Sequence, residues 1–106
     1  MRALVVYLVL GITDESAMAR YRTLSTESLR KAGGHMVDLA PYATQIDGLP
    51  TQWLGAVEFE SEHAARDWYF GSEYQEAVKA RKQGSEQLVF LTVLPFSLRA
   101  SGGAAG

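Results

Sequence analysis

The sequence predicts an α+β domain in which a four-stranded antiparallel sheet carries its helices on one face. Two observations lead to this fold. Apolar, β-branched segments alternate with helical segments in the order βαββαβ, which is the split βαβ arrangement of ferredoxin-like folds. The chain has 106 residues, a length that fits one domain with a core of its own. We expect this domain to span residues 1–96, followed by a flexible tail at 97–106.

Glycines and apolar runs set the expected boundaries of the strands. Residues 2–10 are aliphatic and β-branched without polar alternation, and Gly11 is expected to break this strand. Gly33-Gly34 supplies a left-handed stop for the first helix, and Gly71 interrupts the second helical segment. The expected strands are 2–10, 35–40, 53–59 and 87–94, and the expected helices end near residues 32, 70 and 84.

Capping residues mark the helix starts. Thr13 or Asp14 is suited to cap the first helix, and Ser61 the second. Ser72 is followed three residues later by Gln75, which is the spacing of a capping box. The segment after Gly71 is therefore expected to form a third helix.

The composition excludes several classes of function. The net charge of −2 and the pI near 5.6 give no basic surface for nucleic acid, and no Lys/Arg-rich helix indicates a membrane surface. The chain has no cysteine, and His35 and His63 lack the spacing of metal ligands, so we expect no metal and no cofactor. The first apolar run is too short to cross a membrane, which favours a cytoplasmic protein.

The strands predict a partner. The first and fourth strands are apolar on both faces, although helices can cover only one face of the sheet. Leaving the other face in water would cost several kcal/mol at about 25 cal/mol per Å². We therefore expect a homodimer in which two sheets pack face to face.

The segment from Glu58 to Arg81 resembles a known family. Its strand ends in Glu58-Phe59, the next helix ends in Trp68-Tyr69, and Ser72 to Gln75 and a distal Arg81 follow. With these motifs the chain is similar to the domain-of-unknown-function thirteen-thirty family of the dimeric α+β barrel superfamily. The resemblance covers residues 3–94. It implies the fold and the dimer, and it implies a cavity between sheet and helices like those of cofactor-independent monooxygenases, polyketide cyclases and lactone isomerases.

Arg81 is the main candidate for binding a substrate. Tyr74, Ala77, Val78 and Arg81 follow one helical face, so the guanidinium shares an apolar stripe. It could anchor a carboxylate, phenolate or enolate, or its head could pair with a nearby glutamate or solvent. Trp68, Tyr74 and Tyr7 are the other candidate substrate-binding side chains, although each could equally be core.

Glu58, His35 and Tyr21 are the candidate catalytic residues. Glu58 lies on the opposite strand face from Val57 and could act as a general base or as a structural partner of an arginine. His35 could act as an acid or base, or be an exposed residue at a strand start. Tyr21 would stabilise an oxyanion.

Two kinds of function stay open. The first is a cofactor-independent enzyme with proton-transfer chemistry, of the cyclase, isomerase or dehydratase type, acting on a carbonyl-bearing aromatic or polyketide-like substrate. A cofactor-free monooxygenase is its nearest alternative, ranked lower because the related enzymes use an asparagine and this chain has none. The second is a dimer that binds a small ligand without catalysis.

Overall fold

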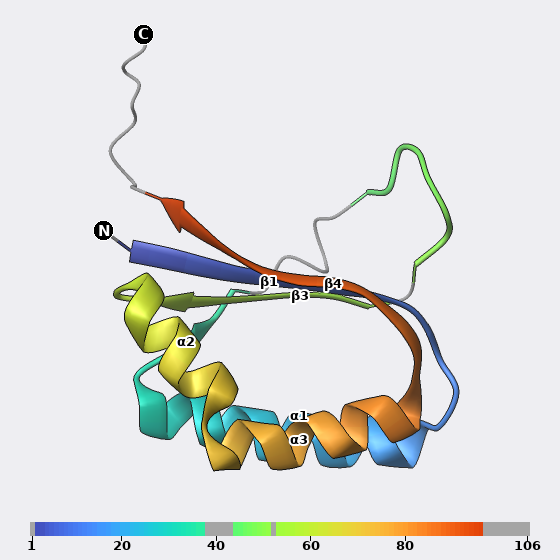
Figure 1. Cartoon of the computed structure of the whole chain (residues 1–106). Helices are drawn as coiled ribbons and strands as arrows, with labels where there is room; N and C mark the ends of the chain where they lie inside the picture. The colour runs from blue at the N-terminus through green and yellow to red at the C-terminus, as the bar shows by residue number, and fades with distance from the viewer. Residues whose placement is uncertain (1, 38–43, 52, 97–106) are drawn as a thin grey trace, which may run out of the picture.

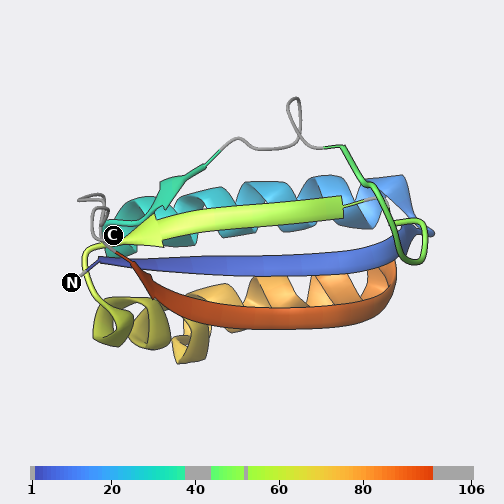
Figure 2. The same cartoon turned by 90° about the horizontal axis from the view of Figure 1, so that it is seen from above.

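The computed structural model consists of two layers, a four-stranded antiparallel sheet and three helices that cover one of its faces (Figures 1 and 2). The structure describes residues 2–37, 44–51 and 53–96. The strand order is β2-β3-β1-β4. The strands are β1 (Arg2–Ile12), β2 (His35–Met36), β3 (Trp53–Phe59) and β4 (Ser85–Phe96), and the helices are α1 (Glu15–Ala32), α2 (Glu62–Phe70) and α3 (Ser72–Gly84).

The predicted α+β fold class is confirmed, and in the described part of the chain four antiparallel strands carry the helices on one face. The predicted tail at 97–106 and residues 38–40 of the predicted second strand lie outside the described residues. Within the described part of the chain, no helix is long and apolar enough to cross a membrane.

The central strand β1 has two chemically distinct faces. It pairs with β3 on one side and with β4 on the other, and its odd-numbered residues from Ala3 to Gly11 are buried. These odd-numbered side chains point to the helices, because successive residues of a strand alternate between faces. The even-numbered residues are half-buried and point to the face without helices, which we call the outer face.

The helix ends follow the predicted capping chemistry in most cases. The Asp14 carboxylate accepts hydrogen bonds from the backbone N–H of Ser16 and Ala17 at 3.0 and 3.1 Å. Ser61 Oγ accepts from the N–H of Ala64 at 3.0 Å. Gly33 ends α1 with φ of 76°, in the left-handed region that glycine adopts without strain.

Two sequence predictions about boundaries are wrong. Gly11 does not break the first strand, since it is still paired to β4 opposite Glu86, and β1 continues to Ile12. Ser72 and Gln75 do not form a capping box, because Gly71 is the N-cap and makes no side-chain bond there. The amide of Gln75 instead donates to the backbone carbonyl of Tyr69 at 2.6 Å, which ties α3 to the end of α2.

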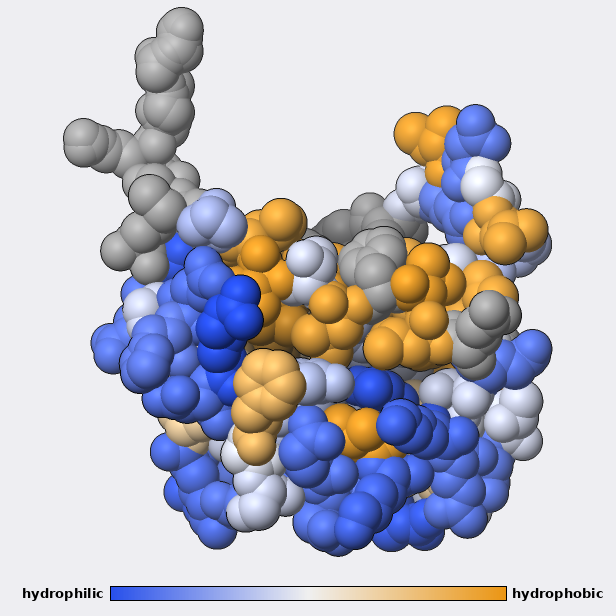
Figure 3. Space-filling model, viewed as in Figure 1, coloured by the Kyte–Doolittle hydropathy of each residue, from blue (hydrophilic) through white to orange (hydrophobic). Residues whose placement is uncertain are grey.

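Apolar side chains gather along the sheet in the side view of Figure 3, above the mainly hydrophilic helices. Pairing in register brings together residues from three strands on the outer face, for example Leu8 with Leu54 and Leu4 with Leu94. Leu94 is 48% exposed and Val89, also on β4, is 49% exposed. One subunit therefore leaves a continuous hydrophobic surface uncovered.

Candidate functional site

Three tyrosines and one arginine meet between the sheet and the helices. Tyr7 comes from β1, Tyr21 from α1, and Tyr74 and Arg81 from α3, and all four side chains are buried. Tyr74 and Arg81 reach the same place because they are seven residues apart on one helical face, as the sequence predicts. We call these four residues the tyrosine–arginine cluster.

Hydrogen bonds connect the cluster. Arg81 Nη1 donates to the hydroxyl oxygen of Tyr74 at 2.9 Å, and the hydroxyls of Tyr74 and Tyr21 are 2.9 Å apart. At the other end, Trp53 Nε1 donates to the hydroxyl of Tyr7 at 3.1 Å. The rings also contact one another, since Tyr21 lies edge-on to both Tyr7 and Tyr74. The cluster therefore places several polar atoms inside an aromatic environment.

The phenols of the cluster stay protonated at neutral pH. Burial raises the pKa of Tyr74 to about 12, although Arg81 beside it acts in the opposite direction. Burial is also the main cause of the raised pKa values of Tyr21 and Tyr7, and each is raised further by a neighbouring tyrosine. At pH 7 only about one Tyr74 in 10⁵ would be ionised. These hydroxyls can therefore both donate and accept hydrogen bonds, but they do not act as bases.

Arg81 is a buried cation without a carboxylate partner among the described residues. Its side chain is only 3% exposed. Glu58 and Glu73, the two glutamates that could have neutralised it, pair with Arg2 at 2.6 Å and with Lys31 at 2.9 Å. Burial lowers the pKa of Arg81, but Tyr74, Tyr21 and Tyr69 raise it and the net direction is upward. The guanidinium therefore remains charged, and among the described residues its hydrogen-bond acceptor is the Tyr74 hydroxyl.

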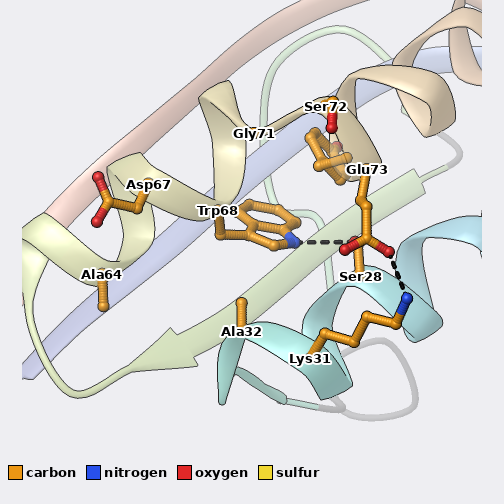
Figure 4. A pocket seen from close by; sticks show the side chains of 10 residues that line it. Ser28, Lys31, Ala32, Ala64, Asp67, Trp68, Gly71, Ser72 and Glu73 are labelled. Atoms are coloured by element: carbon orange, nitrogen blue, oxygen red, sulfur yellow. Dashed lines mark hydrogen bonds and ion pairs between the residues drawn. The ribbon is translucent and has the colours of Figure 1, made fainter.

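Trp68, on α2, packs against the cluster. Its ring is 4.1 Å from that of Tyr74, and its Nε1 donates to Ser28 Oγ on α1 at 3.0 Å (Figure 4). Ser28 is buried and in turn donates to the carbonyl of Ser25 at 2.8 Å. Trp68 and Ser28 line a hollow of about 400 Å³ between α1 and the start of α3, which the Lys31–Glu73 ion pair borders.

A second hollow lies between α2 and β4. It measures about 390 Å³, within the size range of small-ligand sites. Its walls are mainly apolar, and Arg66 and the exposed Phe70 belong to its lining. Tyr69 lines this α2–β4 pocket, and the centroid of its ring lies 5.5 Å from that of Tyr74, so it lies between the pocket and the cluster. The apolar residues of the lining are Val5, Ala65, Leu88, Leu91 and Val93.

Glu58 and His35 lie on the other face of the sheet from Tyr21. Glu58 alternates with the buried Val57 and Phe59, so it belongs to the outer face, where Arg2 Nε donates to it. His35 pairs opposite Glu58 in register and is exposed. The structure therefore brings four predicted residues together, namely Tyr7, Tyr21, Tyr74 and Arg81, with Trp68 beside them. It does not bring the two candidate bases to them.

Two side chains of the site were not predicted, Trp53 and Tyr69. A signal for Trp53 exists in the sequence, because it stands on the same strand face as Val57 and Phe59. Tyr69 stands beside Trp68 in the aromatic motif of the sequence, but its position in the site depends on the packing of α2 against α3. Among the described residues, no three His, Asp or Glu side chains are grouped so that they could hold a metal ion.

The fold and the site together define a ferredoxin-like α+β domain with a buried, donor-rich cluster next to a small pocket. The model of the family described as domain of unknown function (DUF1330) matches residues 2–93, and the chain belongs to this family. The sequence resemblance is thereby confirmed. None of the curated proteins is significantly similar to this chain.

Solved structures share the fold. RPA0582, a protein of unknown function from Rhodopseudomonas palustris, is 22% identical with a TM-score of 0.63, over 91% of this chain and 83% of that one. Its methylated form gives 21% identity and the same TM-score, over 93% and 84% of the two chains. A protein from Bacteroides fragilis, described as dimeric, of unknown function and ferredoxin-like in fold, is 12% identical with a TM-score of 0.48, over 90% and 96%.

Proposed function

We propose that this protein binds a small organic molecule that carries a carboxylate, phenolate or enolate oxygen, and that Arg81 receives this oxygen. The observation that carries the proposal is the buried guanidinium, which has no carboxylate partner among the described residues. A buried cation is costly unless an anion neutralises it, and guanidinium binds oxyanions through two parallel hydrogen bonds.

The α2–β4 pocket is the proposed place for the body of the ligand. Its apolar walls suit an aromatic or polyketide-like skeleton. Tyr69 lines this pocket and packs against Tyr74, to which Arg81 donates, so a ligand that displaced the Tyr69 ring would bring its oxygen toward the guanidinium. Tyr74 would complete the recognition as a second donor, since its hydroxyl stays protonated.

The chemistry that follows is stabilisation of an oxyanion. A protonated Tyr74 and a cationic Arg81 can hold an enolate that develops from a carbonyl compound, which would support isomerisation, cyclisation or dehydration without a cofactor. The base is not supplied by Glu58 or His35 of the same subunit in this proposal, because the sheet separates them from the cluster. Binding is therefore the primary proposal, and enolate formation applies only to substrates that are acidic enough to lose the carbon-bound proton to water.

The test is ligand binding to the full chain. Aromatic carboxylates and β-dicarbonyl compounds would be titrated by calorimetry into the wild type and into Arg81→Met. Loss of a single bidentate contact is expected to weaken binding at least about tenfold. Arg30→Met is the matched control, because Arg30 is exposed and pairs with Glu27 far from the pocket. Equal binding by Arg81→Met and the wild type would overturn the proposal.

We also propose that two copies associate through their outer faces. The support is the continuous apolar surface on three strands, with Leu94 and Val89 about half exposed in one subunit. Such a surface is self-complementary when two copies are related by a two-fold axis. Sedimentation of the wild type at micromolar concentration is expected to give a dimer, and a monomer would contradict this proposal.

A further inference from the structure

Residues 44–51 form an arm that the fold and the cluster leave unexplained. The arm precedes β3 in the chain. It projects from the sheet on the outer face, opposite the helices (Figures 1 and 2). Two large apolar side chains of the arm are exposed to solvent, Ile46 at 94% and Leu49 at 70%. The only charged residue in the arm is Asp47.

The arm holds its own shape. The Gln45 amide nitrogen donates to the carbonyls of Asp47 and Leu49, and its oxygen accepts from the N–H and the hydroxyl of Thr51 at 3.3 and 3.2 Å. Gly48 adopts φ of 98°, which allows the tight turn, and its N–H donates to the Asp47 side chain at 2.8 Å. One side chain therefore braces the whole turn, so the two apolar residues are presented on a preformed surface.

We propose that this arm contacts a second copy of the chain, and that Ile46 and Leu49 pack against the partner subunit in the dimer. This inference rests on the proposed packing of the two outer faces. The arm rises on the side of that face, so a second sheet stacked there would lie within its reach (Figures 1 and 3). The arm of each subunit would contact the other subunit in the same way, as the two-fold symmetry of an isologous interface requires.

The second copy is the occupant that the observations favour. The arm does not fold onto its own sheet, since Ile46 is almost fully exposed. A preformed turn loses little conformational entropy when it binds, which suits a permanent contact between identical subunits. With two exposed apolar side chains and a single charged residue, the arm suits the apolar outer face better than a highly charged partner.

The first experiment compares dimer dissociation constants by sedimentation equilibrium. The double variant Ile46→Ser/Leu49→Ser is expected to raise the dissociation constant at least about tenfold, because buried apolar anchors dominate interface energetics. Phe70→Ser is the matched control, since Phe70 is also 70% exposed but lies on α2, on the helix side. It should leave the dimer unchanged. Equal weakening by Phe70→Ser and the arm variant would overturn the inference.

A third variant separates the arm from the dimer itself. Leu94→Ser alters the outer face and leaves the arm intact. If the wild type is a dimer that Leu94→Ser weakens and the arm variant does not, the arm inference is wrong and the dimer proposal stands. If the wild type is a monomer, the dimer proposal is wrong and the arm inference fails with it.

The second experiment measures the contact directly. The chain has no cysteine, so Ile46→Cys introduces a single thiol at the tip of the arm. A bulky maleimide is expected to react several-fold more slowly at protein concentrations where the dimer forms than at dilutions where it dissociates. Reaction at the same rate in both conditions, with sedimentation showing the change from dimer to monomer, would overturn the inference.

Discussion

Tyr7 lies directly over Gly55, its partner in register across β1 and β3. A Cβ atom at position 55 would overlap the ring and the hydroxyl of Tyr7. The missing side chain therefore makes the space that the phenol occupies, and the hydroxyl is left within reach of Trp53 Nε1. A residue without a side chain thus supports one end of the tyrosine–arginine cluster.

Gly55→Ala is expected to destabilise the protein by displacing Tyr7. Overpacking of this kind costs about 1–3 kcal/mol, and the hydrogen bond from Trp53 should be lost with it. Urea denaturation followed by tryptophan fluorescence would measure the change in the free energy of unfolding. In a Tyr7→Ala background the same substitution should cost far less, because the ring is gone. An equal cost in both backgrounds would show that the Tyr7 ring is not the cause.

Tyr74→Phe is expected to cost more stability than Tyr21→Phe. The first change leaves the buried Arg81 Nη1 without its acceptor, and an unsatisfied buried donor costs about 1–3 kcal/mol. The second change leaves that bond in place and removes only the contact between two hydroxyls, worth about 0.5–1.5 kcal/mol. Urea denaturation of both variants would rank them. The reverse order would contradict the hydrogen-bond chain described above.

Arg81→Met is expected to leave the free energy of unfolding unchanged or to raise it. The substitution removes a buried charge and keeps most of the side-chain volume, and such replacements are often neutral or stabilising. Arg81→Ala should instead cost about 2–5 kcal/mol by opening a cavity. Thermal and urea denaturation would compare the two variants. A loss of more than about 2 kcal/mol in Arg81→Met would mean that the charge serves the fold and not a ligand.

Alkaline pH is expected to destabilise the protein through its buried tyrosines. Burial raises the pKa of Tyr74 from 10.0 to about 12, so the folded state keeps a proton that the unfolded chain releases. This stabilising contribution is complete below pH 10 and is lost as the pH rises through 12. The slope is about 1.4 kcal/mol per pH unit for each such tyrosine.

Circular dichroism and tyrosinate absorbance, recorded together across this range, would test the pH dependence. Tyrosinate formation by Tyr7, Tyr21 and Tyr74 should accompany unfolding, and Tyr74→Phe should make the dependence shallower. Ionisation of every tyrosine near pH 10 in a protein that stays folded would contradict the buried positions of these phenols.

Local chemistry predicted much of the fold. The cap at Asp14 and the left-handed stop at Gly33 depend on neighbouring residues alone, and both are present as expected. Gly11 misled the prediction because pairing with β4 outweighs the weak strand preference of one glycine. The capping box predicted at Ser72 is absent, because the Gln75 amide instead donates to the backbone carbonyl of Tyr69 in α2.

The site was predictable only in part. The helical spacing placed Arg81 beside Tyr74, and alternation in β3 placed Glu58 on the face away from Val57. The contact between Tyr74 and Tyr21 joins residues 53 positions apart, and only the packing of α1 against α3 creates it. The separation of Glu58 from Tyr21 likewise depends on which face the helices cover.

The position of β1 at the centre of the sheet has a consequence for synthesis on the ribosome. β1 precedes every other element, yet it has two neighbours, and its second partner β4 is the last, with Arg2 opposite Phe96. Until β4 has emerged, the nascent chain holds an apolar strand with one open edge, which is a template for aggregation. We expect the domain to remain a client of chaperones until translation has passed β4, and to fold only then.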